Sequence, residues 1–408
     1  MSYKSSINTI FSRSSILLIN FLIVIFTTQI WKSDGRGEIA LVMLNISIII
    51  IVNNIFSGST VAFHTQKTKK NELLLIAFLG SFIISIIGAI LFSLHNNFNN
   101  FTHFFVISFF NSLANTFTLY FLGKNDIKKY NIFLALPPIA IFFFLIILYY
   151  LFNITSINSY FYANYFAYGA IILAGILLLN KNEPFIITKI QLPIVKKISY
   201  YGFNSEVSNL FQFLNYRLTF YFIAEFLGYH ELGVFSVAVA ISEALWIVSK
   251  STSSIHYSYV INSANENENI KRTSLLVRQN FFIGIIFSTT IWFIPNEIFT
   301  FIFGDSFNEV KTIVIYLIPG IIAIASSNII GHYFAGKGKL SILKNKSYLG
   351  CLVTVITAII FIPKYKFIGA CLTINISHIA SSIFLYWHFV KLQRIGINNK
   401  QSQLKNDI

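Results

Sequence analysis

The stretch from Leu73 to Leu94 reads LLLIAFLGSFIISIIGAILFSL and contains no charged side chain. A helix of this length measures about 33 Å, slightly more than the roughly 30 Å hydrocarbon core of a bilayer. An uninterrupted apolar run of this kind is typical of a helix that crosses a membrane. The stretch therefore predicts one transmembrane helix, and similar windows recur along the chain.

These windows fill most of the 408 residues, of which 55% are hydrophobic and 11% charged, with a mean hydropathy of +0.68. A soluble domain has about 25% charged residues, so this chain cannot cover itself in charge. No polar stretch reaches the roughly 50 residues of the smallest independent domain. The sequence predicts an all-α membrane protein with twelve transmembrane helices, near residues 16–30, 39–56, 73–94, 101–122, 132–152, 160–179, 205–227, 232–248, 280–294, 310–330, 348–362 and 368–390.

The basic residues predict the orientation of these spans. Of the 30 Lys and Arg residues, 24, including Lys346, fall in the tails and the even-numbered connections. Arg217 lies within the seventh span, and the opposite connections hold only Lys32, Arg36, Lys311, Lys364 and Lys366. Because positive loops stay on the cytoplasmic side, both termini are predicted to be cytoplasmic. The net charge of +15 then favours anionic membrane lipids as partners and requires no nucleic acid.

Residues 181–203 separate the first six spans from the last six. Within them Ile187, Ile190, Ile194 and Ile198 share one helical face, a pattern typical of a helix that lies on a membrane surface. Pro193 is expected to divide that helix into two pieces. The predicted division is an N-terminal lobe at 1–180, a cytoplasmic interfacial connector at 181–203, and a C-terminal lobe with a short tail at 204–408.

A short internal repeat supports the two lobes. Residues 35–40 (GRGEIA) begin the second span, and residues 228–233 (GYHELG) begin the eighth span at an offset of 193 residues. Six spans return the chain to the same side, so the lobes have the same orientation. Transporters use such parallel repeats and place the substrate between them.

Several features together resemble a known family. They are the twelve spans, the basic connector before Tyr200-Tyr201-Gly202-Phe203, the polar seventh span and the motif GYHELGVFS at 228–236. This layout resembles the Wzx-type bacterial polysaccharide flippases of the multidrug/oligosaccharidyl-lipid/polysaccharide exporter superfamily. The resemblance implies two six-helix lobes around a central cavity. It also implies alternating-access transport of an undecaprenyl-pyrophosphate-linked oligosaccharide across the bacterial plasma (inner) membrane, for O-antigen or capsule assembly.

Charged residues inside the spans are the main candidates for function, since each costs about 2.5–3.5 kcal/mol at a helix centre. Arg217 and Glu243 both lie about 15–18 Å from the outer ends of spans seven and eight, which predicts an ion pair if these spans pack together. The pair has two interpretations that the sequence leaves open. Either Arg217 attracts pyrophosphate or acidic sugar and is released when Glu243 takes up a proton, or the pair permanently fixes the register of two helices.

Other polar residues complete the candidate site. Glu206 lies near the inner end of span seven, where snorkelling to the headgroups is the favoured interpretation and a proton or sodium site the alternative. Candidate substrate-binding residues are Asn209 and Gln212 in span seven and Asn111 and Asn115 in span four. The last two could equally be contacts between helices. Pro319-Gly320 is expected to bend span ten.

The remaining patterns narrow the function class. Trp31 and Trp292 near outer ends, and Trp246 and Trp387 near inner ends, predict an interfacial aromatic belt. The sequence has no metal-ligand spacing and no nucleotide-binding glycine loop, so we expect no metal, no cofactor and no enzymatic activity. The alternatives are an ion-coupled multidrug exporter of the same superfamily and a polysaccharide polymerase or ligase. A polymerase is also a candidate partner of a flippase.

Overall fold

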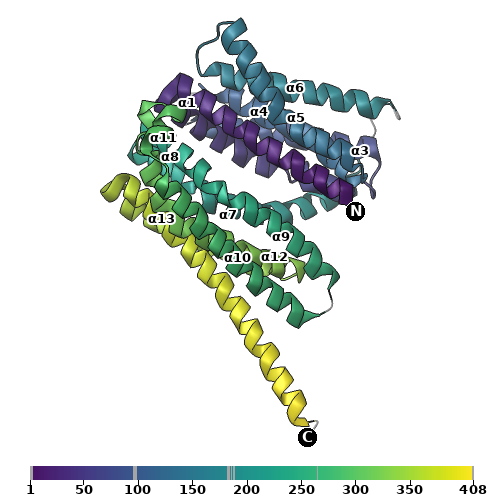
Figure 1. The fold of residues 1–408 in the computed structure, drawn as a ribbon. Helices are drawn as coiled ribbons and strands as arrows, with labels where there is room; N and C mark the ends of the chain where they lie inside the picture. Colours follow the sequence, from purple (N-terminus) through teal and green to yellow (C-terminus); the bar gives the residue numbers. More distant parts are fainter. Residues whose placement is uncertain are drawn as a thin grey trace. The chain divides into compact units, whose positions relative to one another are not determined.

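The computed structural model describes residues 3–94, 99–181, 184, 186, 189–263 and 265–406, and side chains between 16 and 393 except those of 247 and 248. Within these ranges all regular structure is helical, which confirms the all-α prediction. The elements, labelled in Figure 1 where space allows, are α1 (Tyr3–Asn53), α2 (Gly58–His64), α3 (Lys70–Ser93), α4 (Phe101–Gly123), α5 (Ile127–Ile146), η2 (Ile147–Leu151), α6 (Asn158–Asn180), α7 (Leu192–Phe226), α8 (Tyr229–Glu243), α9 (Leu245–Asn262), α10 (Glu266–Phe293), α11 (Asn296–Phe303), η3 (Asp305–Phe307), α12 (Val310–Gly336) and α13 (Leu340–Asn406).

Eight segments of the described chain are long and apolar enough to cross a membrane. Two of them, Ile16–His64 with 49 residues and Leu340–Gln393 with 54, exceed twice the roughly 20 residues that one span needs. Each is broken by a lysine with a positive φ, Lys32 at 54° in α1 and Lys366 at 49° in α13. Each therefore supplies two spans. The more polar α7 and the α8–α9 pair complete the twelve predicted spans.

The two faces of α3 are typical of a helix that lies in lipid. Ser81, Ser85 and Ala89 are fully buried, whereas Ile83 and Ile87, two residues further along in each turn, are 55% and 52% exposed. Large apolar side chains therefore point outwards and small ones point towards neighbouring helices. A soluble helix has the opposite arrangement, and small residues at helix contacts are typical of membrane bundles.

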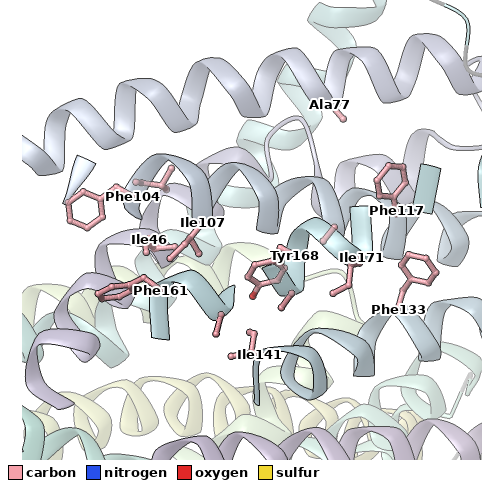
Figure 2. Packing of buried hydrophobic residues seen from close by; sticks show 14 of the residues in the cluster. Ile46, Ala77, Phe104, Ile107, Phe117, Phe133, Ile141, Phe161, Tyr168 and Ile171 are labelled. Atoms are coloured by element: carbon pink, nitrogen blue, oxygen red, sulfur yellow. The ribbon is translucent and has the colours of Figure 1, made fainter. Parts of the chain in front are cut away.

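The described chain forms two compact units. Unit 1 comprises Met1–Trp31 and Ile39–Leu210, and unit 2 comprises Lys32–Glu38 and Phe211–Ile408. The apolar core of unit 1 is built mainly from α1, α3, α4, α5 and α6, and Phe104, Phe133 and Phe161 in it are at most 2% exposed. Figure 2 shows these three rings among the packed side chains. Unit 2 has its own core around Tyr333 and Phe334 of α12.

The connector differs from the sequence prediction. Pro193 lies in the first turn of α7, which then continues to Phe226 as one helix. Proline suits a helix start because its missing N–H would have no partner inside the helix. The N–H of Gln191, two residues before Pro193, donates to the buried carboxylate of Glu72 at 2.9 Å. Pro193 therefore begins α7 instead of dividing a surface helix; Ile187 of the predicted apolar face lies outside the described residues.

Within unit 2, residues 32–38 pack against α8 at backbone contact. A Cβ atom on Gly37 would lie 1.8 Å from the Tyr229 carbonyl oxygen, and one on Gly233 would lie 1.9 Å from the Ser33 carbonyl oxygen. Side chains add to the contact, since Ser33 Oγ lies 2.7 Å from His230 Nδ1. Residues 32–38 and α8 therefore meet through Gly37 and Gly233, where neither backbone leaves room for a side chain.

A neighbouring side chain bonds the backbone of α12 at Pro319-Gly320, where the sequence predicts a bend. Asn375 of α13 accepts a hydrogen bond from the Gly320 N–H at 2.8 Å and donates one to the Tyr316 carbonyl at 2.7 Å. These two backbone groups would bond each other in an unbroken helix. The side-chain amide of Asn375 thus pairs with one backbone N–H and one backbone carbonyl of α12 beside Pro319.

We expect Asn375→Leu to destabilise unit 2 by about 1–3 kcal/mol, because both backbone groups lose their partner in a region with little water. Thermal unfolding in detergent measures the loss. Thr289→Leu is the matched control, since Thr289 is exposed on α10 and bonds only its own helix, at Ile285. Equal midpoints for the two variants would show that the Asn375 side chain does not stabilise α12.

Candidate functional site

Arg217 and Glu243 form a bidentate ion pair inside unit 2. Arg217 Nη1 donates to Glu243 Oε1 at 2.6 Å, and Nη2 donates to Oε2 at 2.7 Å. The side chains are 27% and 20% exposed. Two parallel charge-assisted bonds between planar groups are the strongest arrangement of such a pair. The contact expected from matched depth is present, while its role in transport stays a prediction.

The position of Glu243 in the fold explains part of its need for a partner. It is the last residue of α8, and a break at Ala244 separates it from α9. The end of a helix carries partial negative charge, which disfavours a carboxylate there. The Arg217 guanidinium compensates the charge of the carboxylate. The Arg217 guanidinium also lies 5.3 Å from the centre of the Phe220 ring.

Glu206 does not snorkel to the lipid headgroups, although this was the favoured interpretation of its sequence position. The residue is 4% exposed and lies within unit 1. Its Oε1 accepts from Ser59 Oγ at 3.1 Å, and its Oε2 accepts from Asn209 Nδ2 at 3.0 Å. Snorkelling is wrong because α2 covers this side of α7. Among the described residues Glu206 has no cationic partner, so its carboxyl group is held by neutral donors alone.

The predicted polar residues fall into separate groups. In unit 1, Asn111 donates to the Tyr168 hydroxyl at 2.7 Å, and Asn115 donates to Asn54 Oδ1 at 3.2 Å. In unit 2, Gln212 donates to the Tyr216 hydroxyl of its own helix at 3.3 Å. Asn209 is the only one of the four that contacts another candidate, Glu206, among the described residues. The five substrate-binding candidates are thus divided between the two units.

Sequence reasoning missed a group of residues in unit 2. Lys346, assigned to a cytoplasmic connection, is 3% exposed within α13. Trp246, assigned to the interfacial belt, is 4% exposed, unlike Trp292 at 65% and Trp387 at 59%. His378 is 2% exposed and packs beside Trp246. A helical wheel cannot reveal such burial, because it depends on which neighbouring helix covers each face.

The charged residues of the described chain do not form a metal centre. No group of three or more His, Cys, Asp or Glu residues in these ranges is placed to hold a metal ion.

Comparison with known sequences gives one distant relative. No family model matches this chain. The capsular polysaccharide biosynthesis protein CapF of Staphylococcus aureus is 25% identical over 168 residues, which are 40% of this chain and 42% of that protein. The similarity thus spans less than half of either chain.

Solved structures share the fold over more than nine-tenths of this chain. An inward-facing multidrug resistance transporter of the MATE family in the MOP superfamily has a TM-score of 0.73, 15% identity, and coverage of 93% of this chain and 96% of that one. A mutant of the Vibrio cholerae MATE transporter VcmN has a TM-score of 0.66 and 9% identity, with 96% of both chains covered. The eukaryotic MATE transporter AtDTX14 has a TM-score of 0.64 and 12% identity, with 95% of this chain and 93% of that one covered. These three proteins are transporters and not enzymes, and this chain has their fold.

Proposed function

We propose that this protein is a flippase that moves a lipid-linked oligosaccharide with an anionic pyrophosphate head across the bacterial plasma membrane by alternating access. The fold of MATE transporters supports transport as the class of function. The relative CapF, a capsular polysaccharide biosynthesis protein, supports a polysaccharide precursor as the substrate. A polysaccharide polymerase is the partner that would consume the translocated unit.

The observation that carries this proposal is the Arg217–Glu243 pair. Arg217 lies within a membrane span and retains 27% exposure beside its carboxylate partner. Guanidinium presents five donors in a planar fork, and Glu243 uses only two nitrogens of it. The remaining donors suit phosphate oxygens, which Arg binds in the same bidentate geometry. A site of this kind favours an anionic head over an organic cation.

The proposed arrangement in the membrane has cytoplasmic termini and lobes at residues 1–180 and 204–408. We expect reporter fusions after Lys124 and Gly338 to report the cytoplasm, and fusions after Ser156 and Asn308 to report the outer side. The physical reason is that basic loops are retained inside. Alkaline phosphatase and green fluorescent protein fusions measure the two sides. A cytoplasmic signal after Ser156 would contradict the arrangement.

Glu206 is the proposed coupling group, because a buried carboxyl group held by neutral donors can exchange a proton or sodium ion without breaking an ion pair. We expect Glu206→Gln to keep the protein folded but to remove the dependence of transport on a proton or sodium gradient. Transport into vesicles with imposed gradients measures this. Glu225→Gln is the control, since Glu225 lies near the outer end of the same helix, α7. Gradient-driven transport by Glu206→Gln at the wild-type rate would contradict the assignment.

A multidrug exporter is the second candidate, and the MATE neighbours favour it as much as they favour a flippase. One experiment separates the two. Cells with and without the protein are compared for labelled lipid-linked glycan on the outer face, and for resistance to cationic dyes and drugs. Outer-face glycan that depends on the protein supports the flippase. Drug resistance without any change in glycan supports the exporter instead.

A further inference from the structure

Three aromatic rings gather inside unit 2 beside two lysines. Tyr216 of α7, Trp246 of α9 and His378 of α13 have ring centroids 4.9, 5.7 and 6.0 Å apart, pair by pair; we call them the ring cluster. Lys346 Nζ lies 5.7 Å from the centre of the Tyr216 ring, and Lys250 Nζ lies 5.4 Å from that of Trp246. The cluster therefore joins three helices around positively charged groups.

The ring cluster holds hydrogen-bonding groups that the protein itself does not satisfy. Within the described residues, Trp246 Nε1 has no hydrogen-bond partner, although the residue is only 4% exposed. His378 has only a weak contact with the Gly320 backbone, and neither ring nitrogen has a hydrogen-bond partner. An indole N–H can only donate. Since buried polar groups are normally paired, this surplus of donors indicates a missing acceptor.

The positive charge at the ring cluster is also unmatched. Lys346 is 3% exposed and forms no ion pair in the described part of the chain. Arg217, the residue after Tyr216, is neutralised by both oxygens of Glu243, so that carboxylate is not available to Lys346. A buried charge in a membrane segment normally has an opposite charge beside it. Lys346 is therefore a buried cation of this region without a carboxylate partner among the described residues.

We propose that Lys346 and the ring cluster form a binding site for a phosphate-type anion at the head of an amphiphilic lipid. Phosphate oxygens accept hydrogen bonds without donating, so they match Lys346, Trp246 Nε1 and a ring N–H of His378. A carboxylate or sugar hydroxyl offers fewer acceptor oxygens for these three donors. The diphosphate of the substrate and the phosphate of an anionic membrane lipid share this chemistry. The assignment to substrate rests on the proposed function, whereas the site itself does not.

Binding to the purified full-length protein tests the site. The probes are geranylgeranyl diphosphate, inorganic pyrophosphate, and nanodiscs of phosphatidylglycerol compared with phosphatidylcholine. Lys346→Met should weaken binding of geranylgeranyl diphosphate at least about tenfold and remove the rise in thermal midpoint that the ligand gives. Lys346→Arg should retain most of the affinity. Trp246→Phe keeps a ring but loses the N–H, and should weaken binding by a smaller factor.

Lys344→Met is the matched control. Lys344 lies on the same helix, also approaches a tyrosine ring, Tyr348 at 5.5 Å, and is exposed. This variant should bind the probes within about twofold of wild type, since the charge of Lys344 is already hydrated. Equal binding by Lys344→Met and Lys346→Met would overturn the proposal. The proposal would also be overturned if Trp246→Phe bound the probes as well as wild type while Lys346→Met still bound them tightly.

The arms of the experiment separate the two sources of phosphate. Lys346-dependent binding of both diphosphates, without a preference for phosphatidylglycerol, assigns the site to the substrate head. Lys346-dependent preference for phosphatidylglycerol assigns it to a membrane lipid. If binding depends on Lys346 while outer-face glycan does not depend on the protein, the phosphate site stands and the flippase proposal fails. If glycan export requires the protein but binding ignores Lys346, the site fails alone.

Discussion

Arg217→Ala is expected to reduce outer-face glycan to less than about a tenth of the wild-type amount, which corresponds to a loss of about 1.4 kcal/mol or more in the interaction with the substrate. Membrane insertion should be normal, because the change removes a charge from a membrane span. Arg217→Lys should recover part of the export, since an ammonium attracts an anion but lacks the planar fork. Surface labelling of the glycan, normalised to the amount of protein, measures the effect.

Two further variants distinguish a substrate contact from a structural pair. Glu243→Gln leaves Arg217 without a counter-charge and should destabilise the protein by about 2 kcal/mol. That is less than the roughly 3–5 kcal/mol typical of a fully buried pair, because both side chains remain 20% or more exposed. Exchanging the two residues restores the pair with the cation on α8. Recovery of stability without export supports a contact between Arg217 and substrate, whereas wild-type export by Arg217→Ala would end this hypothesis.

The Arg217–Glu243 contact could be inferred from sequence because depth in a membrane is a simple coordinate. Each residue of a helix advances about 1.5 Å, so counting from the outer ends places both charges at the same level. The cost of an unpaired charge then makes their pairing the favoured outcome. The same counting located the apolar spans, and the two lysines with positive φ mark where consecutive spans turn back.

Depth does not give the direction in which a side chain points, and this explains why the surroundings of Glu206 and Lys346 were predicted wrongly. Glu206 and Lys346 were both placed near the inner surface, where long side chains usually reach water. Glu206 is instead covered by Ser59 of α2, and Lys346 is turned towards Tyr216. Both outcomes depend on contacts between helices far apart in sequence. The only signal of this burial in the local sequence is an excess of residues that are polar as well as aromatic, such as Trp246, near the inner ends of the spans.

The second large effect is expected for Gly233→Ala, because the contact between residues 32–38 and α8 leaves no room for a methyl group. The added Cβ would lie 1.9 Å from the Ser33 carbonyl oxygen and 3.0 Å from the Gly37 nitrogen. Both neighbours are backbone atoms, so no side-chain rotation can relieve the overlap. We expect a loss of about 3 kcal/mol, at the upper end of the usual range for overpacking, seen as a lower thermal midpoint in detergent.

Gly331→Ala is the matched control for this prediction. Gly331 is also buried in a helix of unit 2, but its Cβ would lie 3.4 Å from the end of the flexible Leu343 side chain. This variant should therefore lose little stability, or gain a few tenths of a kcal/mol because alanine favours a helix over glycine. Gly37→Ala should reproduce the effect of Gly233→Ala, since its Cβ would lie 1.8 Å from the Tyr229 carbonyl oxygen. Equal thermal midpoints for Gly233→Ala and Gly331→Ala would mean that residues 32–38 do not pack against α8 at backbone contact.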